Sequence, residues 1–150
     1  MSTGPHILII EARFYDDIAD GLLRGAKTAL DAAGASSETV TVPGILELPS
    51  AAQYAFSKGA AHPNQHYDGM VVLGCAIKGE TDHYEHVCRE SMQGVQHVSL
   101  HLGVPTGNAI LTCPTWELAL DRADPARGDA GGRAAKACLR LIEVKRGFGL

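Results

Sequence analysis

The most apolar segment of the chain is Gly69-Met70-Val71-Val72-Leu73-Gly74-Cys75-Ala76, an uncharged run of small and aliphatic residues. Such a run is typical of a strand that is buried on both faces, as in a parallel sheet covered by helices. A similar apolar segment, residues 6–11, stands near the start of the chain. Both segments precede residues at helical spacing, and this alternation predicts an α/β fold with a parallel sheet.

Working outward from these two strands gives the order β-α-β-α-β-α-β-α-α. Two further strands are expected at residues 38–42 and 108–111, and a loop rich in Gly, Pro and Asp at 124–132. Right-handed crossovers should join the parallel strands. No linker is visible, so residues 1–150 are expected to form a single domain. The apolar positions of the expected helices lie within 18–33, 49–58, 87–102, 116–123 and 134–145.

Composition excludes several classes of function. The 150 residues hold 13 Lys and Arg against 17 Asp and Glu, a net charge of -4 without any basic run, so we expect no nucleic-acid partner. No apolar stretch approaches the ~20 residues that span a bilayer, and the first residues do not resemble a secretory signal. The charged share of 20% is compatible with a buried subunit interface. The cysteines form no C-x-x-C pair, which is typical of reduced thiols in a cytoplasmic protein: Cys75, Cys88, Cys113 and Cys138.

Ligands of an open parallel sheet bind beyond the carboxyl ends of the strands, and two residues there are unusual. Phe14 follows the first strand directly, where a loop is normally polar. It either anchors the start of a helix or offers a stacking surface for a flat heterocycle. Glu47 stands between Pro43 and Pro49. Its carboxylate either complements a helix N-terminus or accepts hydrogen bonds from ligand hydroxyls.

The segment 78–86 combines a glycine loop with the start of a helix. Gly79 permits close backbone approach, Thr81 adds a hydroxyl, and the free N–H groups of a helix start can hold an anion. His83, in the first helical turn, can give and take a proton near neutral pH. The alternatives are ordinary capping residues with a surface histidine, or a metal site on His83 and His86. The H-E-x-x-H pattern and its inverse are both absent, so we expect no metal.

Three arginines stand near glycines in the last third of the chain: Arg122, Arg127 and Arg133. Each either grips a phosphate bidentately or is a solvated surface charge. The G-x-G-x-x-G, G-x-x-x-x-G-K-[ST] and G-x-S-x-G motifs are absent, which removes the main support for dinucleotide, P-loop and serine-hydrolase interpretations.

Several motifs in fixed order resemble one known family. The most specific are P-G-x-x-E-x-P at 43–49 and G-x-x-I-[RK]-G-x-T-x-H at 74–83. Further matching pieces are Glu11-Ala12-Arg13-Phe14, Tyr67-Asp68-Gly69, Val104-Pro105, Ile110-Leu111-Thr112 and Asp121-Arg122-Ala123. Over residues 7–142 the chain resembles lumazine synthase, an enzyme family of riboflavin biosynthesis.

The resemblance implies a fold and a reaction. The fold would be a flavodoxin-like, three-layer α/β/α sandwich with a four-stranded parallel sheet, in an oligomer. The reaction would condense 5-amino-6-(D-ribitylamino)uracil with 3,4-dihydroxy-2-butanone 4-phosphate to 6,7-dimethyl-8-ribityllumazine, phosphate and water. No metal or redox cofactor would be needed.

The resemblance also implies roles for individual residues. Phe14 would stack on the pyrimidine ring, Glu47 would bond the ribityl hydroxyls, and His83 would shuttle protons. Backbone groups of Leu46, Ala76 and Ile77 would read the polar edge of the pyrimidine, and Glu80 and Thr81 would bind the phosphate with Arg122 as counter-charge. Other substrate contacts would come from Gly44, Ile45 and Lys78.

The family assembles as rings of five subunits that share active sites, so the resemblance implies a homo-pentamer or a multiple of it, with the Asn108 region reaching a neighbour's site. Two positions depart from the family pattern, which has an aromatic residue in place of Asn108 and a lysine in place of Ala130. Arg127 or Arg133 could replace that lysine. These departures motivate an alternative function, a catalytically weak paralogue that binds lumazine or flavin as a scaffold or carrier.

Overall fold

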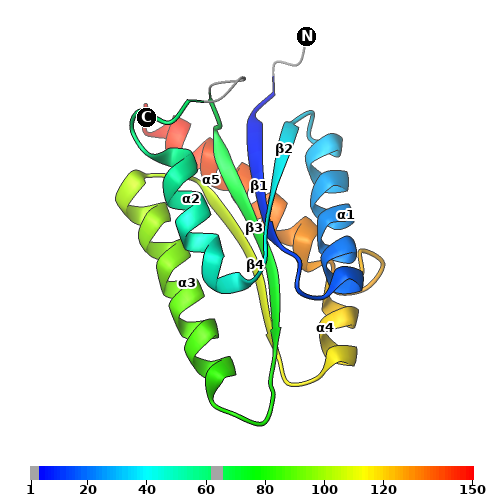
Figure 1. Cartoon of the computed structure of the whole chain (residues 1–150). Helices are drawn as coiled ribbons and strands as arrows, with labels where there is room; N and C mark the ends of the chain where they lie inside the picture. Colours follow the sequence, from blue (N-terminus) through cyan, green and yellow to red (C-terminus); the bar gives the residue numbers. More distant parts are fainter. Residues whose placement is uncertain (1–3, 62–65) are drawn as a thin grey trace.

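Four parallel strands form one sheet at the centre of the computed structural model, which describes residues 4–61 and 66–150 (Figure 1). The strands lie side by side in the order β2-β1-β3-β4, and each neighbouring pair is parallel. This confirms the predicted four-stranded parallel sheet. Their bounds are β1 His6–Ala12, β2 Ser36–Val42, β3 Gly69–Ile77 and β4 Thr106–Cys113.

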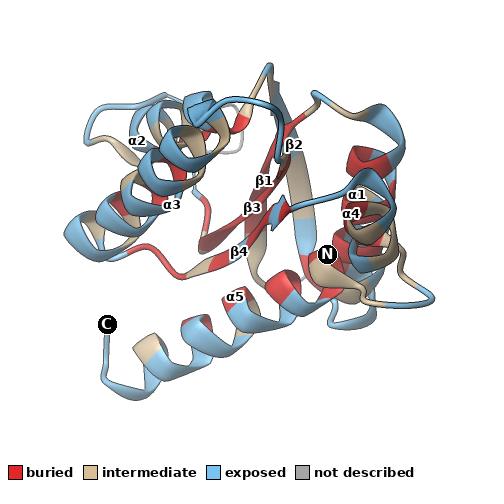
Figure 2. Ribbon diagram, turned by 90° about the horizontal axis from the view of Figure 1, so that it is seen from below, coloured by how far each residue is buried: buried red, intermediate tan, exposed pale blue. Residues whose placement is uncertain are grey.

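Helices cover both faces of the sheet, which makes the three layers expected from the sequence (Figure 1, Figure 2). The helices on one face are α2 (Leu48–Phe56), preceded by the short 3₁₀ helix η1 (Ile45–Glu47), and α3 (His83–Leu102). Those on the other face are α1 (Asp16–Ala32), α4 (Trp116–Ala123) and α5 (Ala130–Gly147). None of the described helices is both long enough and apolar enough to cross a membrane.

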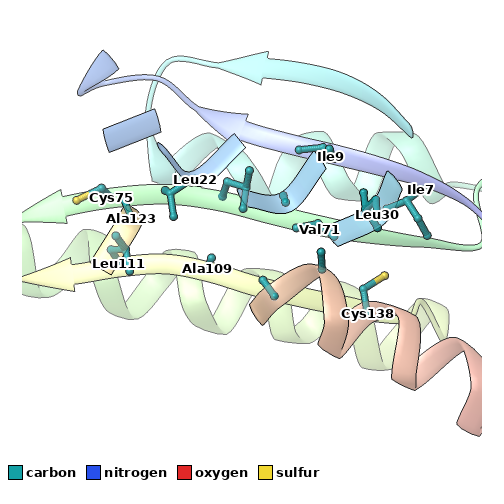
Figure 3. Packing of buried hydrophobic residues seen from close by; sticks show 14 of the residues in the cluster. Ile7, Ile9, Leu22, Leu30, Val71, Cys75, Ala109, Leu111, Ala123 and Cys138 are labelled. Carbon is teal, nitrogen blue, oxygen red and sulfur yellow. The ribbon is translucent and has the colours of Figure 1, made fainter. Parts of the chain in front are cut away.

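The layers enclose two hydrophobic clusters, one on each face of the sheet. Successive side chains of a strand point to opposite faces, so β3 supplies both clusters. Val71 and Leu73 pack toward α1 and α5, whereas Met70 and Val72 pack toward α2 and α3. Figure 3 shows the first cluster, in which β3 and β4 meet α1 and α5. The interpretation of residues 69–76 as a doubly buried strand is thereby confirmed.

The start of α5 differs from the prediction, which assigned residues 124–132 to a loop. The helix begins at Ala130, because the Asp129 side chain accepts a hydrogen bond from the Gly132 amide at 3.2 Å and caps the first turn. A Cβ at Gly131 would overlap the Leu22 carbonyl of α1. Glycines that resemble a loop in the sequence therefore permit close packing of two helices.

Other boundaries shift by less. The strand predicted at 38–42 begins at Ser36, and the one predicted at 108–111 extends from Thr106 to Cys113. The predicted end of the first helix is confirmed, since Gly34 adopts a positive φ of 73° just beyond it.

Gly107 of β4 shows a second close approach of this kind. A Cβ at this position would overlap the Ala134 carbonyl of α5, where the helix lies against the strand. The backbone of a helix cannot move aside as the end of a flexible side chain can. A side chain at position 107 must therefore displace α5.

We expect Gly107→Ala to lower the free energy of unfolding by at least about 2 kcal/mol, through overpacking. Gly147→Ala is the matched control, because a Cβ there would meet no described atom within 4 Å. Urea unfolding followed by circular dichroism measures both. Equal stability of the two variants would show that α5 does not depend on the contact at Gly107.

Candidate active site

The topology leaves a crevice beyond the carboxyl ends of β1 and β3. The chain runs from β1 outward to β2 and from β3 outward to β4, so the loops after β1 and β3 diverge. Open α/β sheets bind ligands at such a switch point. A pocket of about 440 Å³ lies there. Its lining consists of Phe14, Tyr15, Pro43, Gly44, Ile45, Leu46, Glu47, Cys75, Ala76, Ile77, Gly79, Thr81, His83, Tyr84 and Val87.

Phe14 lies at the tip of the loop between β1 and α1. Its side chain is 72% exposed, and its ring meets that of Tyr15 edge-on with centroids 4.9 Å apart. With this exposure the ring gains little from a hydrophobic contact that anchors the start of the helix. An exposed aromatic face at the pocket rim can instead stack on a flat ring.

Glu47 is held by the loop that follows β2. The 3₁₀ helix η1 seats Ile45 against β3 where Gly74 has no side chain, since a Cβ there would lie 2.7 Å from Ile45 Cγ2. Glu47 stands at the start of α2, and within the described chain its side chain makes no hydrogen bond that caps this helix. The exposed carboxylate lies in the pocket lining and can accept hydrogen bonds from a ligand.

The end of β3 forms the floor of the pocket. Pairing of β1 with β3 ends at Glu11 and Leu73, so the last residues of β3 extend beyond β1 with their backbone beside the pocket. Burial raises the pKa of the Tyr15 hydroxyl. Tyr15 and Ile77 both line the pocket and pack against the same hydrophobic cluster, which places the loop after β1 beside the end of β3.

Thr81 and His83 join the pocket from the start of α3. The Thr81 hydroxyl oxygen accepts a hydrogen bond from the His83 amide at 3.3 Å, which leaves the hydroxyl proton for another acceptor. Both side chains are exposed and line the pocket. The prediction that His83 lies in the first turn of a helix is confirmed. The neighbouring Lys78 and Glu80 are exposed on the same loop, outside the lining of the pocket.

Arg122 and Asn108 lie away from the pocket lining in the described chain. The Arg122 guanidinium donates to Cys113 Sγ at 3.6 Å, at the carboxyl end of β4. Asn108 is exposed on β4, where its Oδ1 accepts a hydrogen bond from the Ile110 amide at 2.9 Å. Ala130 is half-buried against the core of the α1 face, which separates it from the pocket. Arg127 forms an ion pair of 2.6 Å with Asp121, so its charge already has a partner.

The candidate metal ligands do not converge. His86 Nε2 lies 3.3 Å from Asp82 Oδ2, one helical turn away. Among the described residues, no three His, Cys, Asp or Glu side chains gather as a metal site would require.

The pocket contains residues that the sequence analysis missed, namely Tyr15, Pro43, Cys75, Tyr84 and Val87. Tyr84 and Val87 are three apart on α3, so the position of His83 could have indicated them once the helix start was known. Burial raises the pKa of the Tyr84 hydroxyl. Its ring packs against the hydrophobic cluster on the α2 and α3 face, which helps to hold the start of α3 in place.

A second hollow, of about 430 Å³, lies at the amino ends of the strands. Its lining includes Tyr67, Asp68, Lys145 and Arg146. No residue predicted from the sequence as part of the site is among the described residues that line it.

The fold and the first pocket together define an α/β protein with a ligand site at the switch point of a parallel sheet. Comparison with known proteins identifies the family. The sequence model of 6,7-dimethyl-8-ribityllumazine synthase matches residues 4–146, and the chain belongs to this family.

Relatives cover nearly the whole chain. The 6,7-dimethyl-8-ribityllumazine synthase of Paramagnetospirillum magneticum is 50% identical over 145 residues, which cover 96% of this chain and 97% of that protein. The 6,7-dimethyl-8-ribityllumazine synthase 1 of Rhizobium meliloti is 49% identical over 144 residues, covering 96% and 94%. The 6,7-dimethyl-8-ribityllumazine synthase of Sphingopyxis alaskensis is 48% identical over 145 residues, which cover 97% of this chain and 98% of that protein.

Cys75 in the pocket wall generates a prediction about alkaline stability. Burial raises the pKa of its thiol from 9.0 to about 12, so the folded protein keeps a proton that the unfolded chain loses. The resulting stability is present below about pH 9 and falls as the pH rises toward 12. We expect Cys75→Ala to flatten this decline, measured by urea unfolding at about pH 8 and about pH 10.5. Val72→Ala, which removes buried atoms but no titrating group, should keep the wild-type slope; equal slopes in all three proteins would contradict the assignment.

Proposed function

We propose that the protein condenses 5-amino-6-(D-ribitylamino)uracil with 3,4-dihydroxy-2-butanone 4-phosphate to form 6,7-dimethyl-8-ribityllumazine, with release of phosphate and water. The observation that carries the proposal is the single pocket that joins Phe14, Glu47, Thr81 and His83 from three separate loops. Family membership supports the same reaction. The chain would act as one domain.

The pyrimidine substrate would bind across the floor of the pocket. Phe14 would stack on the heterocycle, and backbone groups of Leu46, Ala76 and Ile77 would bond its polar edge. The pocket lining supports this arrangement, because all four residues belong to it. Glu47 would accept hydrogen bonds from the ribityl hydroxyls, together with contacts from the Gly44 and Ile45 backbone.

The phosphate of the second substrate would bind at the start of α3. Backbone N–H groups at a helix N-terminus favour an anion, and the Thr81 hydroxyl proton is available there. Backbone donors at Glu80, with the cations Lys78 and Arg122, would complete the site. Arg122 is exposed in the last turn of α4, and its guanidinium lies against Cys113 at the carboxyl end of β4, from which the long side chain would turn toward the phosphate.

His83 would move protons during the reaction. The substrate amine attacks the ketone carbon, the resulting carbinolamine loses water to form an imine, and phosphate then leaves before ring closure. Imine formation moves protons between nitrogen and oxygen, whereas loss of phosphate removes a proton from the carbon next to the imine and leaves an enol; an imidazole can accept and donate the protons of both steps. The position of His83 supports this role, because it stands in the pocket lining with its amide bonded to the Thr81 hydroxyl.

The site would be completed by other copies of the chain in a pentamer or a multiple of it. Large apolar side chains are exposed on the α2 and α3 face, among them Tyr54 and Leu100 at 72% and 73%. Burial of such side chains between subunits would be favourable. A neighbour would bring its Asn108 region to the pocket, a polar group where the family pattern has an aromatic one.

A steady-state assay with both substrates tests the function, with lumazine formation followed by absorbance and an enzyme-free reaction as background. Turnover well above background supports the synthase. A rate equal to background from folded, assembled protein would overturn it. Tight binding of lumazine or riboflavin in calorimetry would then favour the carrier function that Asn108 and Ala130 motivate.

We expect His83→Ala to lower kcat by about 10²- to 10⁴-fold, the usual contribution of a general acid–base group. His86→Ala is the matched control: it lies on the same helix with its ring against Asp82, and it should keep wild-type kcat. Steady-state kinetics at saturating substrate gives both values. Unchanged turnover in the His83 variant would remove this residue from the mechanism.

We expect Arg122→Ala to raise KM for the butanone phosphate by about 10- to 100-fold, the cost of losing a charge-assisted contact. KM for the pyrimidine should stay near the wild-type value. Arg140→Ala, which removes an exposed cation of α5 paired with Glu143, should alter neither constant. If only the KM for the pyrimidine changed, the proposed contact of Arg122 with the phosphate would be contradicted.

A further inference from the structure

An ion pair between a buried carboxylate and a partly exposed guanidinium stands at the end of β1, directly before Phe14. The Glu11 side chain is almost fully buried, and Arg13 Nε donates to both of its carboxylate oxygens, at 3.1 and 3.0 Å. A buried carboxylate needs such pairing, because its charge is otherwise costly to remove from water. Glu11 therefore fixes the side chain of Arg13 in one geometry.

Arg13 extends this contact to α1. Its guanidinium lies 3.2 Å from Asp16 Oδ1 and 2.7 Å from Asp20 Oδ1, in the first two turns of the helix. The hydrogen bond to Asp20, followed by those to Glu11 and Asp16, raises the pKa of Arg13. The planar guanidinium meets the three carboxylates with three different nitrogens, Nε for Glu11, Nη1 for Asp16 and Nη2 for Asp20.

The same cluster reaches β2. The Arg13 amide donates to the Val42 carbonyl at 3.1 Å, and the Thr41 hydroxyl donates to Glu11 Oε2 at 2.7 Å. Val42 is the last residue of β2, directly before the loop that carries Glu47. The pair Glu11–Arg13 thus joins β1, β2 and α1 at the point where two pocket loops begin.

Phe14 depends on its neighbours for its position. Its side chain is exposed, and its described ring contact is with Tyr15, the next residue along the chain. The placement of the ring is therefore set by the backbone on either side. Arg13 holds that backbone on one side, and the start of α1, fastened by Asp16 and Asp20, holds it on the other.

We infer that Arg13, fixed by Glu11, is a positioning residue that holds the Phe14 ring at the height and angle needed to stack on the pyrimidine substrate. This inference rests on the proposed function. Arg13 acts through Phe14 and touches neither substrate. The pair should therefore govern binding of the pyrimidine and leave binding of the butanone phosphate unchanged.

The first test is Glu11→Gln, which preserves shape and the contact with Thr41 but removes the charge that holds Arg13. We expect KM for the pyrimidine to rise at least about tenfold, as small misplacements of a binding group do, with kcat and the other KM close to wild type. Arg13→Lys, which keeps charge but loses the fork, should shift the same constant. Arg140→Gln, which breaks the exposed pair with Glu143 on α5, is the control without effect.

Combination with Phe14→Ala separates positioning from general damage. If the pair acts through the ring, Glu11→Gln should raise the pyrimidine KM in the wild-type background and leave it unchanged in the Phe14→Ala background. Equal fold-changes in both backgrounds would overturn the inference, as would a rise in both substrates' KM or a loss of kcat alone.

Hydrogen exchange provides a readout that does not depend on turnover. Glu11→Gln should speed exchange of the Arg13 amide and of residues 14–17, while β3 keeps its protection. Unchanged exchange in this loop would overturn the inference even in an active enzyme. The two proposals can fail separately. If the wild-type protein forms no lumazine but Glu11→Gln speeds exchange as expected, the proposed function is overturned, and the role of Arg13 in fixing the loop is still supported.

Discussion

The handedness of the crossovers is the constraint on which the rest of this structure depends. Parallel strands joined through helices are connected in the right-handed sense. With the strand order β2-β1-β3-β4, the connection from β1 to β2 runs toward one edge of the sheet, and the connections from β2 to β3 and from β3 to β4 run toward the opposite edge. The helix α1 must then lie on one face, and α2 and α3 on the other. The loops after β1 and β3 diverge for the same reason, and the pocket opens where they separate.

Close backbone packing makes this arrangement compact enough to shape the pocket. Gly74 lets η1 lie against β3, and that contact sets where the loop with Glu47 stands. Gly107 and Gly131 let α5 lie against β4 and α1. Gly74 lies beside the pocket, whereas Gly107 and Gly131 lie on the opposite face of the sheet. The absence of a side chain at glycine therefore serves the geometry of the pocket at one position and the stability of the fold at the other two.

The sequence predicts the sheet and most of the site because the relevant signals are local. Apolar runs reveal buried strands, and strand ends reveal loops, so the amino-acid order alone singles out Phe14, Glu47, Thr81 and His83. The predicted start of α5 is wrong because the turn preference of glycine was weighed without the partner helix that glycine accommodates. The place of Tyr15 in the pocket was not predicted, because it depends on which way the residue before α1 faces, a result of packing.

The residues of the pocket differ in kind from those that the fold requires. An aromatic ring left 72% exposed gains little from burial, and a carboxylate at a helix start that forms no cap within the described chain gains little from the backbone. Yet the structure holds both beside a fixed floor, and at the start of the Phe14 loop it buries the Glu11 carboxylate of an ion pair, whose desolvation is itself costly. A chain selected for stability alone would have replaced these groups with apolar ones. Their convergence on one crevice therefore argues for a ligand that has an aromatic plane, several hydroxyls and an anionic group, the features that the two substrates of the proposed reaction share between them.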